Sequence, residues 1–137
     1  MMSKKMIELN KTISKHLQKI PDLLAIYIFG SVADGVDNAG SDIDVAFLAE
    51  DSLDDVARWN IAQELAINFQ RDVDLIDLNN CSEVLRFQIV SKGQLIFAKN
   101  KKIVNQFADK SYWLYMDLQE LKTTQYADIK ERRAVYG

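Results

Sequence analysis

A glycine–serine pair and an acidic pair, separated by ten residues, carry most of the chemistry that the sequence offers. Gly30 and Ser31 follow one apolar run, and Asp42 and Asp44 open the next. A glycine lets backbone approach a ligand closely, and amides at a helix start bind phosphate oxygens. Residues two apart on a strand share a face, so the two carboxylates lie together and attract a divalent cation. These are the parts of a site for nucleotidyl transfer.

A third carboxylate comes from a later apolar segment, DVDLIDL. Asp72 and Asp74 share one face of this expected strand, and Val73 and Leu75 share the other. If the strand neighbours the acid-bearing one, Asp74 completes a set of three carboxylates. Such a set can hold two magnesium ions about 3.5–4 Å apart for in-line displacement at phosphorus. Asp72 stays an alternative, and Asp77 faces the other way as an expected surface or loop acid.

Other catalytic motifs are absent from the sequence. Gly30 and Gly35 have the spacing of a P-loop, but Val36 and Asp37 stand where lysine and serine or threonine are required. The only histidine, His16, lies in a polar segment where we expect it to be exposed, which argues against a Ser-His-Asp triad. The single cysteine cannot form an intramolecular disulfide and is compatible with a reducing compartment.

Length and composition indicate one globular domain. The chain has 137 residues, of which 48% are hydrophobic and 27% charged, values typical of a soluble protein. No apolar run approaches the ~20 residues of a membrane span. The N-terminal segment is too polar for a secretory signal, so we expect a cytoplasmic protein.

The charges are distributed unevenly along the chain. No lysine or arginine occurs between Lys19 and Arg58, a stretch that carries nine acids. An acidic half disfavours generic nucleic-acid binding, which requires a basic face, and suits a place where cations collect. We interpret most of these acids as solvated surface.

Alternating apolar runs and helical patterns predict the elements that position these residues. The expected strands are Leu23–Phe29, Ile43–Ala49, Asp72–Leu78 and Gln94–Ala98. The expected helices are an amphipathic one from Met6 to Ile20 stopped by Pro21, a short one at 31–36 followed by a loop at 37–41, one from a Ser52/Asp55 capping box to about Gln70, one at 82–92, and a long one from Lys101 beyond Lys130. This alternation predicts an α/β or α+β fold, with a parallel or a mixed sheet both open. The short connection from Gly30 to Asp44 favours antiparallel pairing of the first two strands.

The C-terminal helix carries an apolar seam and an aromatic cluster. The seam is predicted to comprise Ile103, Phe107, Leu114, Leu118 and Leu121. The cluster of Tyr112, Trp113 and Tyr115 is interpreted as helix packing or a partner surface, with stacking on an adenine as the alternative.

The chain resembles the DNA polymerase β-like nucleotidyltransferase superfamily, and within it the minimal nucleotidyltransferases. The resemblance rests on Gly30-Ser31, the ten-residue gap and Asp42-x-Asp44, and on the segments VADG, SDIDVAFL, VDLIDL and LRFQIVSKGQLIFA. It implies a single domain over residues 1–137, with a core at about 23–98 formed by a small mixed sheet flanked by helices, and a C-terminal helix at about 101–133. It also implies Mg²⁺-dependent transfer of AMP from ATP by an antitoxin to a tyrosine of a HEPN-domain ribonuclease toxin.

The resemblance also implies roles for individual residues. Gly30 and Ser31 hold the β- and γ-phosphates of ATP, and Asp42 and Asp44 bind two metal ions. Asp74 binds the catalytic metal and helps to deprotonate the attacking hydroxyl.

A cation for the leaving pyrophosphate is expected from the helix after the third strand. Arg86 is assigned to nucleotide binding, with Lys92 as the other candidate.

Two other functions stay open at this stage. One is adenylation of a small molecule of the aminoglycoside type, although such enzymes usually carry a further substrate-binding domain. The other is neutralisation of a partner by contact alone.

Overall fold

The computed structural model describes residues 4–33 and 42–136, but not the side chains of residues 31, 32 and 125–136. The elements run α1 (Lys4–Leu17), β1 (Leu23–Phe29), α2 (Gly30–Ala33), β2 (Ile43–Ala49), α3 (Asp55–Phe69), β3 (Val73–Asp77), α4 (Glu83–Lys92), β4 (Gln94–Ala98) and α5 (Lys101–Tyr136). The predicted strands are therefore confirmed, three of them to the residue, and β3 is one residue shorter at each end than predicted. The expected continuation of the short helix to residue 36 and the loop at 37–41 lie outside the described residues.

The four strands form one mixed sheet in the order β3-β2-β1-β4. β1 is antiparallel to both β2 and β4, whereas β2 and β3 are parallel. The expected antiparallel pairing of the first two strands is confirmed. The parallel pair requires a crossover, which α3 supplies.

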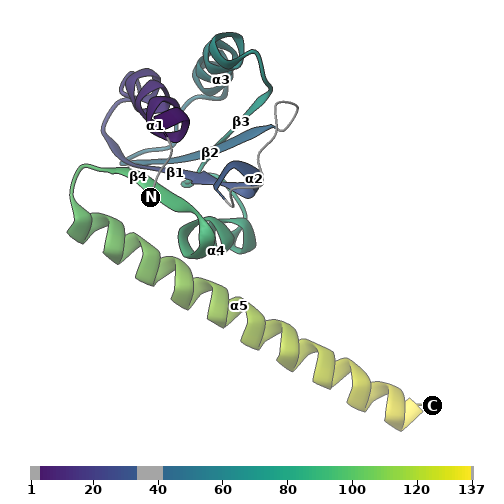
Figure 1. The fold of residues 1–137 in the computed structure, drawn as a ribbon. Helices are drawn as coiled ribbons and strands as arrows, with labels where there is room; N and C mark the ends of the chain where they lie inside the picture. Colours follow the sequence, from purple (N-terminus) through teal and green to yellow (C-terminus); the bar gives the residue numbers. More distant parts are fainter. Residues whose placement is uncertain (1–3, 34–41, 137) are drawn as a thin grey trace.

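Helices cover both faces of the sheet (Figure 1), α1 and α3 on one face and α4 and α5 on the other. Strand β2 is buried on both faces over most of its length. Ile43, Val45 and Phe47 pack toward α1 and α3, while Ala46 and Leu48 pack toward α4 and α5. Asp44, the acid of β2, must therefore occupy the α4 face at the point where this packing ends.

The helix α1 is held by its apolar stripe of Leu9, Ile13 and Leu17, all buried. The predicted capping box of α3 is wrong. The N-cap is Asp54, whose carboxylate accepts a hydrogen bond from the Ala57 amide at 3.2 Å. Asp54 directly precedes the first helical residue, so its side chain reaches the third amide of the helix, as an N-cap requires.

The helix α5 crosses α4 and continues past it toward the C-terminus (Figure 1). Its predicted seam is partly wrong, because Ile103 and Leu121 are 38% and 59% exposed. Val104 and Ser111 are buried instead, and Phe107, which lies between them in the sequence, packs against the same core cluster as Val104. The predicted members Phe107, Leu114 and Leu118 are half-buried, so the predicted seam is wrong only at its two ends. Among the described helices, none combines the length and apolar character needed to cross a membrane.

Asp77 was expected at the surface or in a loop, and this expectation is wrong. The residue is 4% exposed at the end of β3. Its Oδ2 accepts a hydrogen bond from the Leu53 amide at 2.8 Å, and its Oδ1 accepts one from the Asn79 amide at 3.0 Å. Asn79 in turn donates its Nδ2 to the Ala49 carbonyl at 2.7 Å. This carboxylate ties the segments at the ends of β2 and β3 together, at the end of the sheet away from Asp44.

We expect Asp77→Asn to lower the free energy of unfolding by about 1–3 kcal/mol, the range for a buried hydrogen-bonding group left without its partner. An asparagine oxygen can accept only one of the two amide bonds, and its NH₂ faces the other amide. Urea unfolding measures the change, with Asp117→Asn on the exposed surface of α5 as the matched control. Equal stability of the two variants would contradict the structural role of Asp77.

Candidate functional site

Asp44 and Asp74 lie side by side on neighbouring strands. They are register partners in the parallel pair of β2 and β3. Neighbouring strands lie about 4.8 Å apart, so their side chains on one face meet. Asp42 stands immediately before β2 and is exposed, as is Asp74, while Asp44 is half-buried. The condition on which Asp74 could join the acidic pair, that its strand neighbours the acid-bearing one, is therefore met.

The register also separates the two candidates for the third acid. Asp74 is the direct partner of Asp44, whereas Asp72 precedes β3 and its carbonyl accepts a hydrogen bond from the Ile43 amide at 2.9 Å. Burial raises the pKa of the Asp44 carboxyl above its ordinary value, and the charges of Asp74 and then Asp42 raise it further. The carboxylates that act on Asp44 are thus Asp42 and Asp74.

Gly30 stands against this acidic cluster. Its φ is +75°, a left-handed conformation that residues with a Cβ rarely adopt. A Cβ on Gly30 would overlap Oδ2 of Asp44 and lie 3.1 Å from its Cγ. Phe29, the preceding residue, is the register partner of Asp44 on β1. The strand end that carries the glycine–serine pair therefore packs directly on the central acid.

Ser31 is the second residue of the short helix α2. The position of its hydroxyl lies outside the described side chains, so its phosphate contact stays a prediction.

A cavity of about 330 Å³ opens beside Gly30. Its walls are Phe29 and Gly30 from the end of β1, and Leu85, Gln88, Ile89 and Lys92 from α4. Lys92 is exposed at the last turn of α4 and provides the positive charge of this lining. Sequence reasoning missed Gln88, although its spacing of four residues from Lys92 places the two on one helix face.

Arg86 does not lie at this cavity. Its Nε donates to the Leu78 carbonyl at 2.9 Å and its Nη2 donates to the Cys81 carbonyl at 3.3 Å. Both acceptors follow β3, at the end of the sheet away from Asp44. The guanidinium holds the connection between β3 and α4, so the geometry does not support its assignment to nucleotide binding.

The aromatic cluster of α5 packs on α4. The ring of Tyr115 stacks on Phe87 with 4.1 Å between centroids and 4° between planes. Tyr112 contacts Phe87 at 6.0 Å and Trp113 at 5.6 Å. None of these rings lines the cavity beside Gly30. The geometry supports the interpretation as helix packing and a surface rather than adenine stacking.

The acids suit a magnesium site that the substrate completes. Among the side chains that the structure describes, no three from Asp, Glu, His or Cys form a metal-ligand set by themselves. Magnesium prefers oxygen ligands and usually combines one or two carboxylates with substrate phosphates. The repulsion at Asp44 is the cost that a bound cation would remove. The donors present therefore fit Mg²⁺ held jointly by the carboxylates and a polyphosphate.

Comparisons with known proteins agree with this geometry. Residues 11–102 match the family model described as Polymerase beta, Nucleotidyltransferase. The chain is 39% identical over 125 residues to the protein adenylyltransferase MntA of Shewanella oneidensis strain MR-1, a match covering 91% of this chain and 89% of that protein.

Solved structures of toxin–antitoxin complexes share the fold. One is a toxin–antitoxin with AMP-PNP, at a TM-score of 0.81 and 40% identity, covering 88% of this chain and 97% of that chain. Another holds a tri-AMPylated Shewanella oneidensis HEPN toxin with its MNT antitoxin, at a TM-score of 0.77 and 37% identity, covering 90% and 97%.

The contact between Gly30 and Asp44 can be isolated by a double-mutant cycle. We expect Gly30→Ala to destabilise the protein by about 1–2 kcal/mol from its backbone alone, with the overlap with Asp44 adding to this. In an Asp44→Ala background only the backbone cost remains. Urea unfolding of the four proteins measures the difference, and an equal cost in both backgrounds would refute the close approach.

The charge on Asp44 should destabilise the metal-free fold. Folding raises the pKa of the Asp44 carboxyl. The protonated carboxyl therefore contributes its full stability at a pH below the pKa of the unfolded chain, and this contribution is lost as the pH rises through the pKa of the folded protein. We expect Asp44→Asn to raise Tm by about 2–4 °C at pH 7, and to change it little near pH 3. Thermal unfolding against pH without divalent cations tests this, with Asp51→Asn as the exposed control. A Tm at pH 7 equal to or below that of the parent would contradict it.

Proposed function

Since the chain belongs to the polymerase β nucleotidyltransferase family, we propose that it is an antitoxin enzyme that transfers AMP from ATP to a tyrosine of a HEPN-domain toxin and so neutralises it. The observation that carries the proposal is the register of Asp44 with Asp74 beside Gly30. Intact acids at this junction indicate catalysis rather than contact alone. The MntA relative and the tri-AMPylated HEPN toxin support the reaction and the acceptor class.

The phosphates of ATP are placed at the start of α2. The left-handed backbone at Gly30 brings the chain close to Asp44, and the amides that follow at Ser31 and beyond offer donors to the β- and γ-phosphates. The Ser31 hydroxyl adds a further donor. Lys92, at the cavity beside Gly30, supplies positive charge in the role first assigned to Arg86.

The carboxylates hold the metal and move the proton. Two Mg²⁺ ions held by Asp42, Asp44 and Asp74 would neutralise the triphosphate and stabilise charge that develops at the reacting phosphorus. The tyrosine oxygen forms a bond to the α-phosphorus, and the bond from that phosphorus to the bridging oxygen breaks, releasing pyrophosphate. Asp74 accepts the tyrosine proton. It is exposed at an edge strand of the sheet, where an acceptor on another protein can reach it.

The whole chain acts as one domain in this proposal. Residues 23–98 form the catalytic core, and the helix that begins at Lys101 packs on α4. The partner is a HEPN toxin in a hetero-oligomer, the substrate is ATP, and the setting is the cytoplasm.

The third acid provides the test of the mechanism. We expect Asp74→Asn to reduce AMP transfer by about 10²-fold or more, because it removes a proton acceptor and a metal ligand. The matched control, Asp72→Asn, removes an exposed acid two residues earlier and should leave the rate within a few-fold. The assay follows label from α-labelled ATP into the co-expressed toxin in the presence of Mg²⁺.

Two outcomes would count against the proposal. Full transfer by a folded Asp74→Asn protein would remove Asp74 from the mechanism. Label on a small molecule but none on the toxin would favour the small-molecule alternative.

A further inference from the structure

A second cavity lies between α1 and the end of α3, on the face of the sheet opposite the acids. Its volume is about 510 Å³, larger than that of the cavity beside Gly30 and within the range of small-molecule sites. Helix α1 contributes Lys5, Glu8, Leu9 and Thr12, and the end of α3 with its following turn contributes residues 68–71. Leu9 and Phe69 belong to the core on this face. We call this space the α1–α3 cavity.

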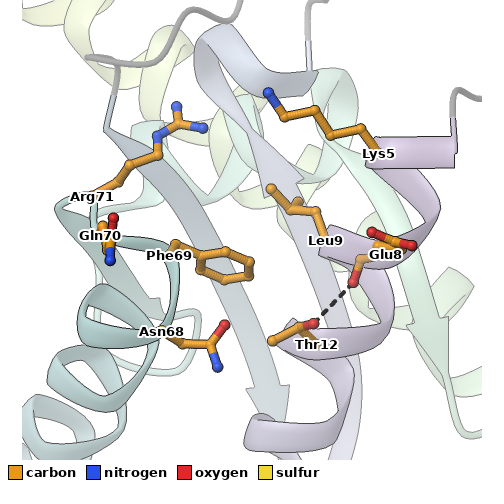
Figure 2. A pocket seen from close by; sticks show the side chains of 8 residues that line it. All are labelled: Lys5, Glu8, Leu9, Thr12, Asn68, Phe69, Gln70 and Arg71. Atoms are coloured by element: carbon orange, nitrogen blue, oxygen red, sulfur yellow. Dashed lines mark hydrogen bonds between the residues drawn. The ribbon is translucent and has the colours of Figure 1, made fainter.

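The middle of the α1–α3 cavity is apolar and partly flat. Figure 2 shows the ring of Phe69 projecting from the end of α3 toward Leu9 on α1. Phe69 is only half-buried although it packs on the core. An exposed aromatic ring inside a concavity offers a stacking surface to a planar group, a contact that is worth about 1–3 kcal/mol for a nucleic-acid base.

Two amides flank this ring. Asn68 and Gln70 precede and follow Phe69, and both line the cavity. A carboxamide presents a donor and an acceptor together, the pattern that pairs with the N6 and N7 edge of adenine. Gln70 is also held in a left-handed conformation, with φ 54° and ψ 38°, at the C-cap of α3. Glycine is the usual residue in this conformation, and it would fit there with less strain. The chain instead has glutamine, whose side-chain amide lines the cavity.

Two cations stand at one end of the same cavity. Figure 2 shows the Lys5 ammonium and the Arg71 guanidinium directed across this end from opposite walls. Glu8 also lines the cavity, and Figure 2 shows its carboxylate beside α1, away from the space between the two cations. The Thr12 hydroxyl donates to the Glu8 carbonyl at 3.0 Å. A lysine and an arginine on facing walls suit a phosphate group, which an arginine can bind through two parallel hydrogen bonds.

We propose that the α1–α3 cavity is a second adenine-nucleotide site, separate from the reaction site. The base lies against Phe69 between the amides of Asn68 and Gln70, and the phosphate lies between Lys5 and Arg71. The occupant is an AMP group from one of two sources. It is either a free nucleotide or the AMP already attached to an acceptor that is to be modified again. The second source rests on the proposed function, whereas binding of free AMP does not.

Binding of AMP to the purified protein in EDTA is the primary test, by isothermal titration calorimetry. The chelator removes the divalent cation that the reaction site requires, so binding that persists reports the α1–α3 cavity. We expect Lys5→Ala/Arg71→Ala to weaken AMP binding at least about tenfold. The control Lys11→Ala/Lys99→Ala makes the same change in net charge at exposed positions outside the cavity and should bind as the parent does.

Gln70→Gly distinguishes a binding role from a structural one. Glycine relieves the left-handed backbone, so the protein should be as stable as the parent or more so, while AMP binding weakens about three- to tenfold. Ribose 5-phosphate, which lacks the base, should bind at least about tenfold more weakly than AMP. No AMP binding in EDTA, binding unchanged in both variants, or equal binding of ribose 5-phosphate would each overturn the proposal.

The Lys5→Ala/Arg71→Ala protein also separates the two sources. If the occupant is the attached AMP, the first transfer to the toxin keeps its rate and the later additions fall, as mass spectrometry of the toxin measures. If the occupant is a free nucleotide, added AMP changes the rate of the first transfer by the parent protein but not by this variant. AMP binding in EDTA by a protein that transfers no AMP would preserve this site while refuting the proposed function.

Discussion

The close approach of Gly30 to Asp44 is the contact on which the candidate reaction site depends. It requires a backbone that only glycine adopts without strain, and it leaves no room for a Cβ. Since β1 and β2 are antiparallel partners here, the end of one strand and the beginning of the other meet at a single point. The turn at Gly30, where we propose that the phosphates bind, and the central carboxylate are thereby joined within one pair of hydrogen-bonded strands.

The two faces of the sheet differ in what they do for the candidate site. The packing of Val45 and Phe47 under α1 and α3 anchors β2, so Asp44 lies on a strand that is buried in the core. On the other face α4 lines a cavity beside Gly30, to which Lys92 contributes its charge. At the far end of the sheet, Asp77 and Arg86 use their charges on backbone groups. Two acids of one strand thus differ in their surroundings. Asp77 is buried and hydrogen-bonded to backbone amides, whereas Asp74 is exposed beside Asp44, where we propose that it takes part in the reaction.

Much of this could be predicted from the sequence, because local periodicity determines it. The strands and the shared face of Asp42 and Asp44 follow from alternation at period two, and the glycine–serine pair marks the turn. What failed depends on neighbours remote in sequence. Nothing in the residues near Asp77 indicates that its carboxylate will accept a hydrogen bond from the Leu53 amide. The buried seam of α5 differs from the predicted one at Ile103 and Leu121 because packing against α4 determines which of its residues are covered. The guanidinium of Arg86 hydrogen-bonds to a carbonyl eight residues earlier, at Leu78, and the local pattern does not indicate this contact either.

The parallel pairing of β2 with β3 also has a consequence for the order in which the protein matures. Asp44 and Asp74 meet only after the intervening chain has folded into α3 and returned along the sheet. Such non-local contacts form late, because the loop must close before any bond across it forms. A nascent chain that has completed β1 and β2 already possesses the turn at Gly30 but lacks the third acid. The proposed site is therefore complete only once the crossover has formed, because the first two strands supply the glycine turn, Asp42 and Asp44 but not Asp74.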